Sequence, residues 1–388
     1  MEAVLEKITM KNKTSKIDWR SYQREIIPIA VIILCALVFD AWSGGAFITP
    51  RNLSNLSRQV CVNLTLAIGM TLIILTSGID LSVGSVLALS GMTAAISQVH
   101  WQWSQMGVTG AVFSFALAIA VGGLSGATTG LAVSRLKITP FIVSLGMMVI
   151  ARGLTLIISS AQAVAPLGET LGRLSSDYLS PESSLFLLSV TAVGVVTILI
   201  RQWIKKTAPV FEITKTLFAT LALCGGGIYI FCNYRGIPYM VFISVLCALS
   251  GIFILKYTRL GRFIYAIGGN REAAELSGVP VAKTLGLTYF MMGCLAGLAG
   301  VMDSARVNGA VPSAGELGEL DAIAAVVIGG TSLMGGVGTI GGTVLGVLIM
   351  GILNNGMSLV GVSEHYQKVF KGIVIILAVY LDLRSKKK

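Results

Sequence analysis

Ionisable side chains inside long apolar runs are the residues of this chain whose chemistry stands out. They are Asp40, Asp80, Arg152 and the pair Asp303 and Arg306. A charge within a bilayer costs roughly 3 kcal/mol or more unless it is paired or hydrated, so each is a candidate for a pathway or gate. The set is too small for a proton relay, which needs a series of such groups.

Two interruptions of the apolar pattern, at residues 76–85 and 329–338, combine Gly with small polar residues. We expect a broken or re-entrant helix at each, because irregular backbone at membrane depth usually lines a cavity. Their comparable places in the two halves suggest an internal repeat. Asp80 either caps the helix that begins near residue 82 or shapes a pathway. The small polar side chains either line that pathway or bond between helices. These candidates are Ser77, Asp80, Ser82, Ser85, Thr331, Ser332, Asn354 and Asn355.

The polar segment 259–283 carries the signals of a short helix outside the lipid. Asn270 can cap its start, Glu272 falls in its first turn, and Leu276 is expected to make an apolar contact. Gly278 and then Pro280 are typical of a stop. The segment is either an ordinary connector or a lever inserted into a partner protein.

Residues for enzyme chemistry are missing from the sequence. It holds only two His, no G-x-x-x-x-G-K-[ST] phosphate loop and no nucleophile elbow. The G-x-G-x-x-G at 336–341 follows no soluble strand and has no acid about 20 residues on, so a dinucleotide site is not expected. The six Cys lie in apolar runs without metal-ligand spacing. We therefore predict no catalytic residue, no metal and no cofactor.

Composition identifies the elements that must position these residues. Of the 388 residues, 54% are hydrophobic and 12% charged, and the mean hydropathy is +0.83. Apolar blocks of about 20 residues recur, so we predict an all-α polytopic membrane protein of ten to twelve transmembrane helices. The blocks fall near 27–47, 59–77, 82–98, 108–133, 138–160, 185–203, 214–232, 238–256, 283–304, 322–354 and 368–383.

Basic residues predict the orientation. The net charge of +11 comes from short Lys and Arg clusters beside apolar blocks, which is typical of topology signals and not of nucleic-acid binding. Both termini are predicted to be cytoplasmic. We expect a cytoplasmic segment at 1–26, one permease domain at 27–383 with a cytoplasmic loop at 257–282, and a basic tail at 384–388. No cleavable signal peptide is evident at the start.

The longest loops on the opposite side carry acids. The first loop spans residues 161–184 and the second spans 307–321. They are either docking surfaces for a partner or solvated connections. The candidate docking residues are Glu169, Asp177, Glu182, Glu316 and Glu319.

Several motifs together resemble the permeases of bacterial monosaccharide ABC importers, the ribose, arabinose, galactose and xylose group. The resemblance runs from about residue 50 to 382, and the extra apolar stretch at about 185–236 is most like the xylose-type members. The motifs are TSGIDLSVGSVLALSG (76–91), SRLKITPFIVSLGMMVIARG (134–153), GRFIYAIGGNREAAELSGV (261–279), ELDAIAAVVIGGTSLMGGVGTIGGT (319–343) and LGVLIMGILNNG (345–356).

The resemblance implies an inner-membrane permease that pairs with a second copy, with a cytoplasmic ATP-binding subunit and with a periplasmic sugar-binding protein. Its cargo would be a monosaccharide, D-xylose first. The short helix would be the coupling helix that enters a cleft on the ATPase. The residues implied are Asn270, Arg271, Glu272, Ala273, Ala274, Glu275, Leu276, Ser277 and Gly278.

Two other classes of function are weighed against this interpretation. An ion-gradient-driven secondary sugar transporter would need several ionisable groups within the bundle, and few are present. A membrane enzyme would need a nucleophile, a metal cluster or an acid/base pair, and the sequence offers none.

Overall fold

A computed structural model describes residues 19–205 and 209–386, and within these ranges every regular element is helical. Residues 1–18 of the predicted N-terminal segment, 206–208, and 387–388 of the basic tail lie outside the described residues. The first helices are α2 (Trp19–Trp42), α3 (Pro50–Leu75), α4 (Val83–Val99), α5 (Val108–Ser134), α6 (Pro140–Ile158), α7 (Glu169–Ser176), α8 (Pro181–Ile204) and α9 (Val210–Gly227). They are followed by α10 (Tyr239–Tyr257), α11 (Arg259–Gly269), α12 (Arg271–Leu276), α13 (Val281–Val307), α14 (Gly318–Ile328), α15 (Ile340–Leu359) and α16 (Glu364–Lys386).

Helix starts follow local sequence signals. Pro occupies the first position of α3, α6 and α8, where its missing N–H is not needed. Thr49 and Ser180 stand just before α3 and α8, and their side-chain oxygens accept hydrogen bonds from backbone N–H groups in the first turn.

Eight of the described helices are long and apolar enough to cross a membrane: α3, α5, α6, α8, α9 with its π-helical end, α10, α13 and α15. Two shorter apolar helical stretches add to these. One is Ile27–Trp42 within α2, and the other is the whole of α4. The prediction of an all-helical polytopic membrane protein is therefore confirmed, while the number of ten to twelve transmembrane helices stays a prediction.

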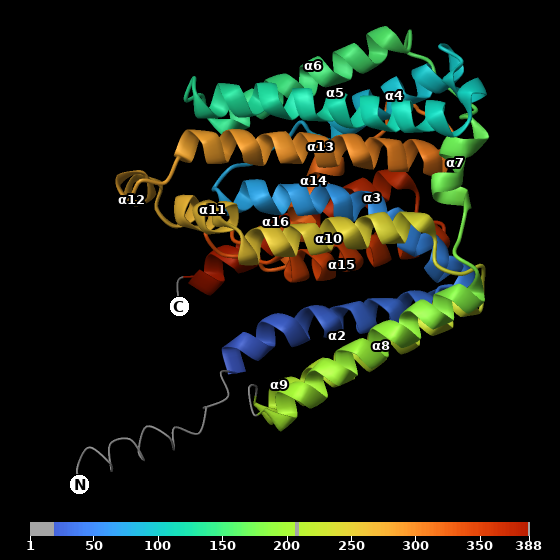
Figure 1. The fold of residues 1–388 in the computed structure, drawn as a ribbon, viewed down its shortest axis with the longest axis vertical. Coiled ribbons are helices and arrows are strands. Elements are labelled where there is room, and N and C mark those ends of the chain that lie inside the picture. The colour runs from blue at the N-terminus through green and yellow to red at the C-terminus, as the bar shows by residue number, and fades with distance from the viewer. Residues whose placement is uncertain (1–18, 206–208, 387–388) are drawn as a thin grey trace.

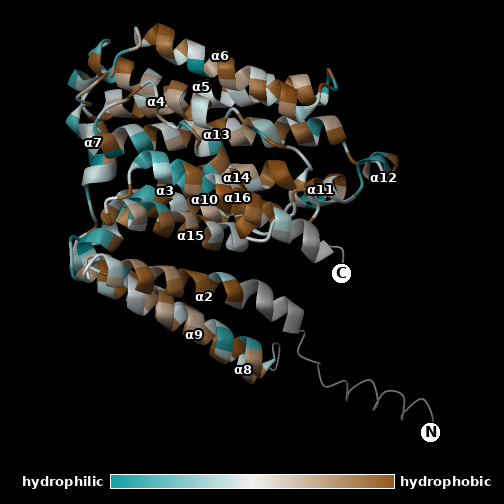
Figure 2. Cartoon of the chain, turned by 180° about the vertical axis from the view of Figure 1, so that it is seen from behind, coloured by the Kyte–Doolittle hydropathy of each residue, from teal (hydrophilic) through white to brown (hydrophobic). Residues whose placement is uncertain are grey.

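The helices lie in layers (Figure 1). α4, α5 and α6 form one side, α13 lies beneath them, and α3, α10, α14, α15 and α16 follow. α2, α8 and α9 lie at the other side, where α2 packs against α15 through Phe39 and Gly356. The same order is seen from behind in Figure 2, where apolar residues dominate most helices. In the extra region at 185–236, α8 and α9 thus pack against each other at the edge of the bundle. Only 11% of the most apolar window of α8 is buried, compared with 83% for α3.

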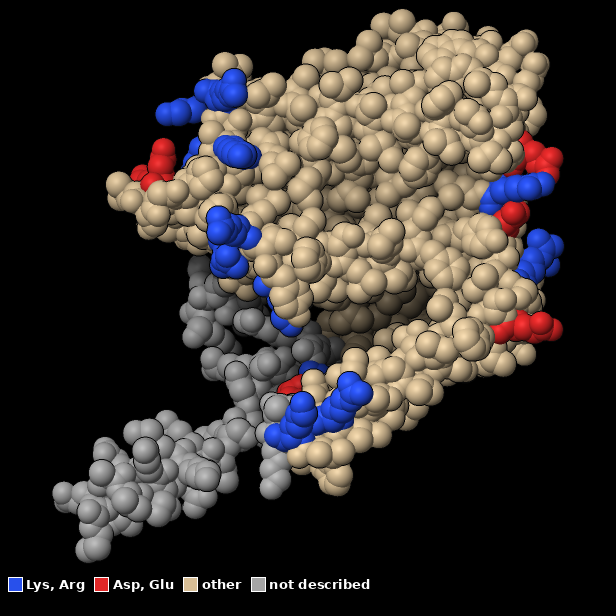
Figure 3. Space-filling model, in the orientation of Figure 1, with Lys and Arg blue, Asp and Glu red and all other residues tan. Residues whose placement is uncertain are grey.

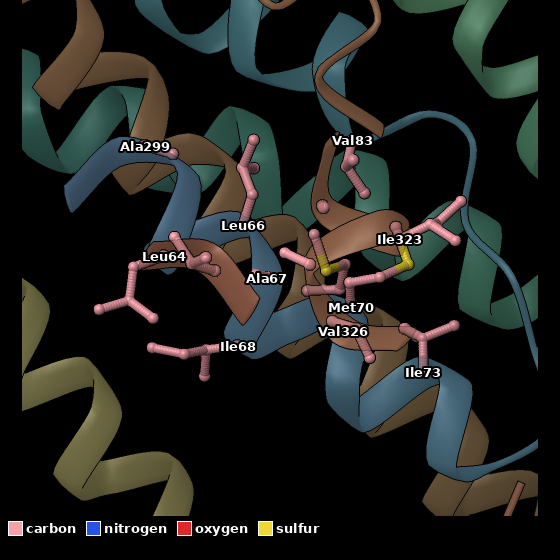
Figure 4. Packing of buried hydrophobic residues seen from close by; sticks show 14 of the residues in the cluster. Leu64, Leu66, Ala67, Ile68, Met70, Ile73, Val83, Ala299, Ile323 and Val326 are labelled. Atoms are coloured by element: carbon pink, nitrogen blue, oxygen red, sulfur yellow. The ribbon is translucent and has the colours of Figure 1, made fainter. Parts of the chain in front are cut away.

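The core centres on α3, which is buried along most of its length. Figure 4 shows Met70 and Ile73 of α3 close to Val83 at the start of α4 and to Ile323 and Val326 of α14. Apolar packing around α3 therefore holds the helices that flank both interruptions.

Small residues bring α5 and α13 into close contact. A Cβ atom on Gly126 would lie 2.9 Å from the Cα of Gly293, and one on Gly293 would lie 2.8 Å from the Cα of Gly126. The four-residue spacing of Gly122, Gly126 and Gly130 on α5 places them along this contact. These glycines therefore serve the close packing of α5 against α13.

Replacing Gly126 by Val should destabilise the bundle by about 1–3 kcal/mol, because the added side chain has no space against α13. Gly146→Val on α6 is the matched control, since a Cβ atom there meets nothing within 4 Å. Thermal unfolding in detergent would measure the difference. Equal melting temperatures for the two variants would contradict the packing account.

Candidate functional site

The first interruption is held by Asp80. Its Oδ1 accepts the backbone N–H of Ser82 at 2.8 Å and the Ser82 hydroxyl at 2.6 Å, immediately before α4 begins at Val83. Asp80, Ser82 and Ser85 are all buried. Asp80 therefore fixes the turn that leads into α4, whose N-cap residue is Ser82, and accepts no hydrogen bond from the first turn of the helix itself. A role of Asp80 in a pathway stays a prediction.

The start of α4 lies against the loop that precedes α14. A Cβ atom on Gly84 would collide with the carbonyl oxygen of Gly315, and it would lie 2.6 Å from Oε2 of Glu319. The N-termini of α4 and α14, each with a partial positive charge, therefore lie near one another and near the Glu319 carboxylate. Glu319, a predicted docking residue, is half-buried here, whereas Glu316 is exposed.

The second interruption is bonded to the first. Gly336 N–H donates to the carbonyl oxygen of Leu75 at 3.0 Å, and the Ser77 hydroxyl donates to the carbonyl oxygen of Met334 at 2.7 Å. Thr331 and Ser332 are buried within the same loop. Segments about 260 residues apart in sequence thus form one bonded unit.

α11 packs against this unit. The Tyr265 hydroxyl donates to the carbonyl oxygen of Gly338 at 2.8 Å, and burial raises the pKa of Tyr265, so the phenol stays a donor at neutral pH. A Cβ atom on Gly268 would collide with the carbonyl oxygen of Leu75 and the N–H of Gly336. α11 was not expected from the sequence, although its apolar residues follow helical spacing.

α12 begins and ends as predicted. Asn270 Oδ1 accepts the N–H of Ala273 at 2.9 Å, and Gly278 has a φ of +82° just after the helix. The apolar contact, however, differs from expectation. Ala274 is buried, whereas the Leu276 side chain is 90% exposed. A two-turn helix is too short for its periodicity to show which face packs inward.

A cavity of about 310 Å³ lies where α12 meets the two interruptions. It brings Ser77 of the predicted pathway together with Asn270 and Arg271 of the short helix. The remaining lining residues are Thr76, Gly78, Val133, Pro140, Ile267, Gly268, Gly269, Leu285, Tyr289 and Met334.

The last two pathway candidates lie far from Ser77, near the end of α15 away from α12. Asn355 Oδ1 accepts from Asn52 Nδ2 at 2.9 Å, and Asn354 Nδ2 lies 3.5 Å from Asp321 Oδ2. Asp321 also pairs with Lys371 at 2.8 Å. The predicted pathway residues are therefore divided among three places: the start of α4, the two bonded interruptions, and the C-terminal part of α15.

A second cavity, of about 320 Å³, lies beside Asn354. α3, α13, α14, α15 and α16 all contribute polar side chains to it. Its lining is Gln59, Val62, Asn63, Asp303, Arg306, Asp321, Asn354, Ser358, Glu364, Gln367, Lys368 and Lys371. Sequence reasoning missed most of these. Polar pairs four residues apart on an otherwise apolar helix, such as Gln59 with Asn63, were the available signal.

Most of the acids proposed for docking lie on exposed segments. Glu169 pairs with Arg173 at 2.6 Å and raises the pKa of that guanidinium. Asp177 accepts from the Ser176 hydroxyl at 3.1 Å, Glu182 is exposed in the first turn of α8, and Glu316 pairs with Lys368 at 3.0 Å.

The other ionisable candidates within the apolar runs are bonded. Asp40 Oδ1 accepts the N–H of Ile48 at 2.9 Å, and Arg306 pairs with Asp303 at 2.8 Å. Arg152 of α6 donates to the carbonyl oxygens of Pro312 and Ala314, just ahead of α14. Among the described residues, no three His, Cys, Asp or Glu side chains form a group that could hold a metal ion.

Residues 52–379 match the protein family described as branched-chain amino acid transport system / permease component. The chain is 39% identical over 376 residues to the xylose transport system permease protein XylH of Haemophilus influenzae, which covers 94% of this chain and 96% of that protein. It is 37% identical to XylH of Escherichia coli K12, over 93% of this chain and 92% of that one. The ribose import permease protein RbsC of the same strain is 39% identical, over 95% of both chains. No solved structure matches the chain.

Gly268→Ala should loosen both interruptions, because its methyl group would separate α11 from Leu75 and Gly336. Hydrogen–deuterium exchange of residues 76–82 and 331–338 should accelerate on the order of tenfold or more, since overpacking costs about 1–3 kcal/mol. Gly269→Ala is the control, because its Cβ atom meets nothing within 4 Å. Unchanged exchange in Gly268→Ala would show that this contact does not hold the loops.

Proposed function

Because the chain belongs to the branched-chain amino acid transport system / permease component family, it is a membrane permease without a catalytic activity of its own, and we propose that its cargo is a monosaccharide. Relatives named for xylose and ribose, aligned over more than nine-tenths of the chain, support a sugar over an amino acid. D-xylose is the first candidate, since XylH proteins of two organisms are among these relatives. A neutral, hydroxyl-rich pentose suits a route lined by Ser, Thr and Asn better than one lined by fixed charge.

The exposed α12 is the observation that carries the assignment to an ATP-driven importer. Its Leu276 side chain is 90% exposed, while its buried Ala274 fixes the helix to the bundle. An exposed apolar side chain on a short rigid helix suits insertion into a cleft of a partner. We assign residues 270–278 to contact with a cytoplasmic ATP-binding subunit, and the cavity behind α12 joins this segment to Ser77 of the first interruption.

Charge supports the orientation. Figure 3 shows most Lys and Arg in view at the side of the molecule that carries α11, α12 and the end of α8, and most acids in view at the opposite side. By the positive-inside rule, α12 and both termini would face the cytoplasm of a bacterial inner membrane. The periplasmic sugar-binding protein would then dock at the end that carries Glu169, Asp177, Glu182 and Glu316. A second copy of the chain would complete the pathway.

The bonded interruptions support alternating access. The segments 76–82 and 329–339 are irregular backbone, and α11, which leads directly into α12, contacts them through Gly268 and Tyr265. A displacement of α12 would reach α4 and α14 through Leu75 and Gly336, and would rock the bundle between outward and inward states. A ligand shifts such an equilibrium only through unequal contacts with the two states.

Uptake into membrane vesicles tests the function. With the ATP-binding subunit, the binding protein and ATP present, the chain should concentrate D-xylose, and it should not do so alone under a proton or sodium gradient. Gradient-driven uptake by the isolated chain would establish the secondary transporter instead. ATP-dependent uptake of leucine but not of xylose or ribose would reject the sugar assignment.

Leu276→Asp should weaken association with the ATP-binding subunit about 30-fold or more, because truncation of a central apolar contact costs 2 kcal/mol or more. Sugar-stimulated ATP hydrolysis should fall with it, while membrane insertion is unchanged. Leu276→Met, which keeps an apolar side chain, is the matched control. Normal stimulation in Leu276→Asp would remove α12 from the coupling account.

A further inference from the structure

The polar cavity beside Asn354 has the features of a built site. Its volume of about 320 Å³ lies at the lower end of the range typical of small-molecule pockets. The helices that form it are distant in sequence, from Gln59 on α3 to Lys371 on α16. It lies at the end of the bundle opposite α12, beside the last turn of α13 and the C-terminal part of α15.

Two residues that line this cavity each carry a buried oxygen without a hydrogen-bond partner. One is Oδ1 of Asn354, a residue only 6% exposed, and the other is Oδ1 of Asp321. The remaining polar atoms of both side chains are engaged, since Asn354 Nδ2 reaches Asp321 Oδ2, which also pairs with Lys371. An unpaired buried acceptor costs about 1–3 kcal/mol, so these two atoms call for donors from a ligand.

The charges of the lining do not favour one sign strongly, although Lys368 also pairs with Glu316 outside the lining. Asp303, Asp321 and Glu364 are balanced by Arg306, Lys368 and Lys371, which gives three acids and three bases. The acid Asp303 is paired with Arg306, and Asp321 with Lys371. A neutral ligand with several hydroxyl groups fits this lining, because hydroxyls both donate and accept.

We propose that this cavity is a binding site for a neutral monosaccharide within the permease itself, with Asn354 Oδ1 and Asp321 Oδ1 accepting hydrogen bonds from two sugar hydroxyls. The half-buried amides of Gln59 and Asn63 lie along the α3 wall, where they can bond further hydroxyls. This proposal rests on the proposed function and adds the place where the sugar is held after it leaves the binding protein.

Paired charges beside amides also give such a site selectivity. A branched-chain amino acid would place an apolar side chain against Gln59, Asn63 and the Asp321–Lys371 pair, and would leave these polar groups without partners. That mismatch disfavours an amino acid by the cost of each unpaired group. The cavity therefore selects by hydroxyl groups, independently of the specificity of the binding protein.

Direct sugar binding to the permease tests the proposal. The full chain in nanodiscs, without ATP or binding protein, would be titrated with D-xylose and observed by saturation-transfer NMR. Saturable binding is expected for the wild type. Asn354→Leu should weaken it at least about fivefold, because a sugar donor then lacks its buried acceptor. Asn233→Leu, at an exposed residue outside the cavity, is the matched control and should bind as the wild type does.

Gln59→Leu provides an independent variant on a different helix and should also weaken D-xylose binding, without removing the Asp321–Lys371 pair. The proposal is overturned if the wild type shows no saturable D-xylose signal, or if both cavity variants bind as tightly as Asn233→Leu. Either result can coexist with normal ATP-dependent uptake in vesicles, which would leave the proposed function standing. Leucine that competes with D-xylose at equal affinity would likewise overturn the selectivity.

Discussion

Backbone polar groups at the two interruptions must find partners inside an apolar bundle, and the rest of the structure depends on how they do so. Water is scarce there, and each unpaired group would cost several kcal/mol, on the order of the cost of burying a polar group without a partner. Hydrogen bonds between the interruptions themselves satisfy these groups, from Gly336 to Leu75 and from Ser77 to Met334. Asp80 and Arg152 complete the arrangement at Ser82 and at the loop ahead of α14.

These bonds place α14 between the two cavities. Its C-terminal end leads into the loop bonded to Leu75 and Tyr265, next to the cavity behind α12. Its N-terminal end carries Asp321, which pairs with Lys371 in the second cavity. An 11-residue helix spans about 16 Å, so one short rigid element links the proposed coupling helix with the proposed sugar site. Coupling by a shift of α14 would reach it from α12 through α11 and the loop that follows α14.

Much of this arrangement could be predicted from the sequence, for identifiable reasons. Apolar runs and Pro residues marked the long helices, and Asn270 with Gly278 marked α12, because these signals act locally. The sequence could not predict that Leu276 is exposed, that Glu319 is half-buried, or that Asp321 pairs with Lys371. They depend on which helices meet, and partners 50 residues apart leave no periodic trace in one sequence. Gln59 and Asn63 were visible as a polar pair on α3, but only the cavity gives them a role.

In the proposed mechanism, α12 moves together with the bonded interruptions when the ATP-binding subunit closes. The direct measurement is the distance between spin labels on non-natural amino acids at the positions of Glu275 and Ser358, in the assembled transporter, by pulsed electron resonance. Both residues are exposed, one on α12 and one beside the second cavity. The account predicts that a non-hydrolysable ATP analogue shifts the distance distribution. A distribution identical with and without the analogue, in transporter that binds it, would contradict the account.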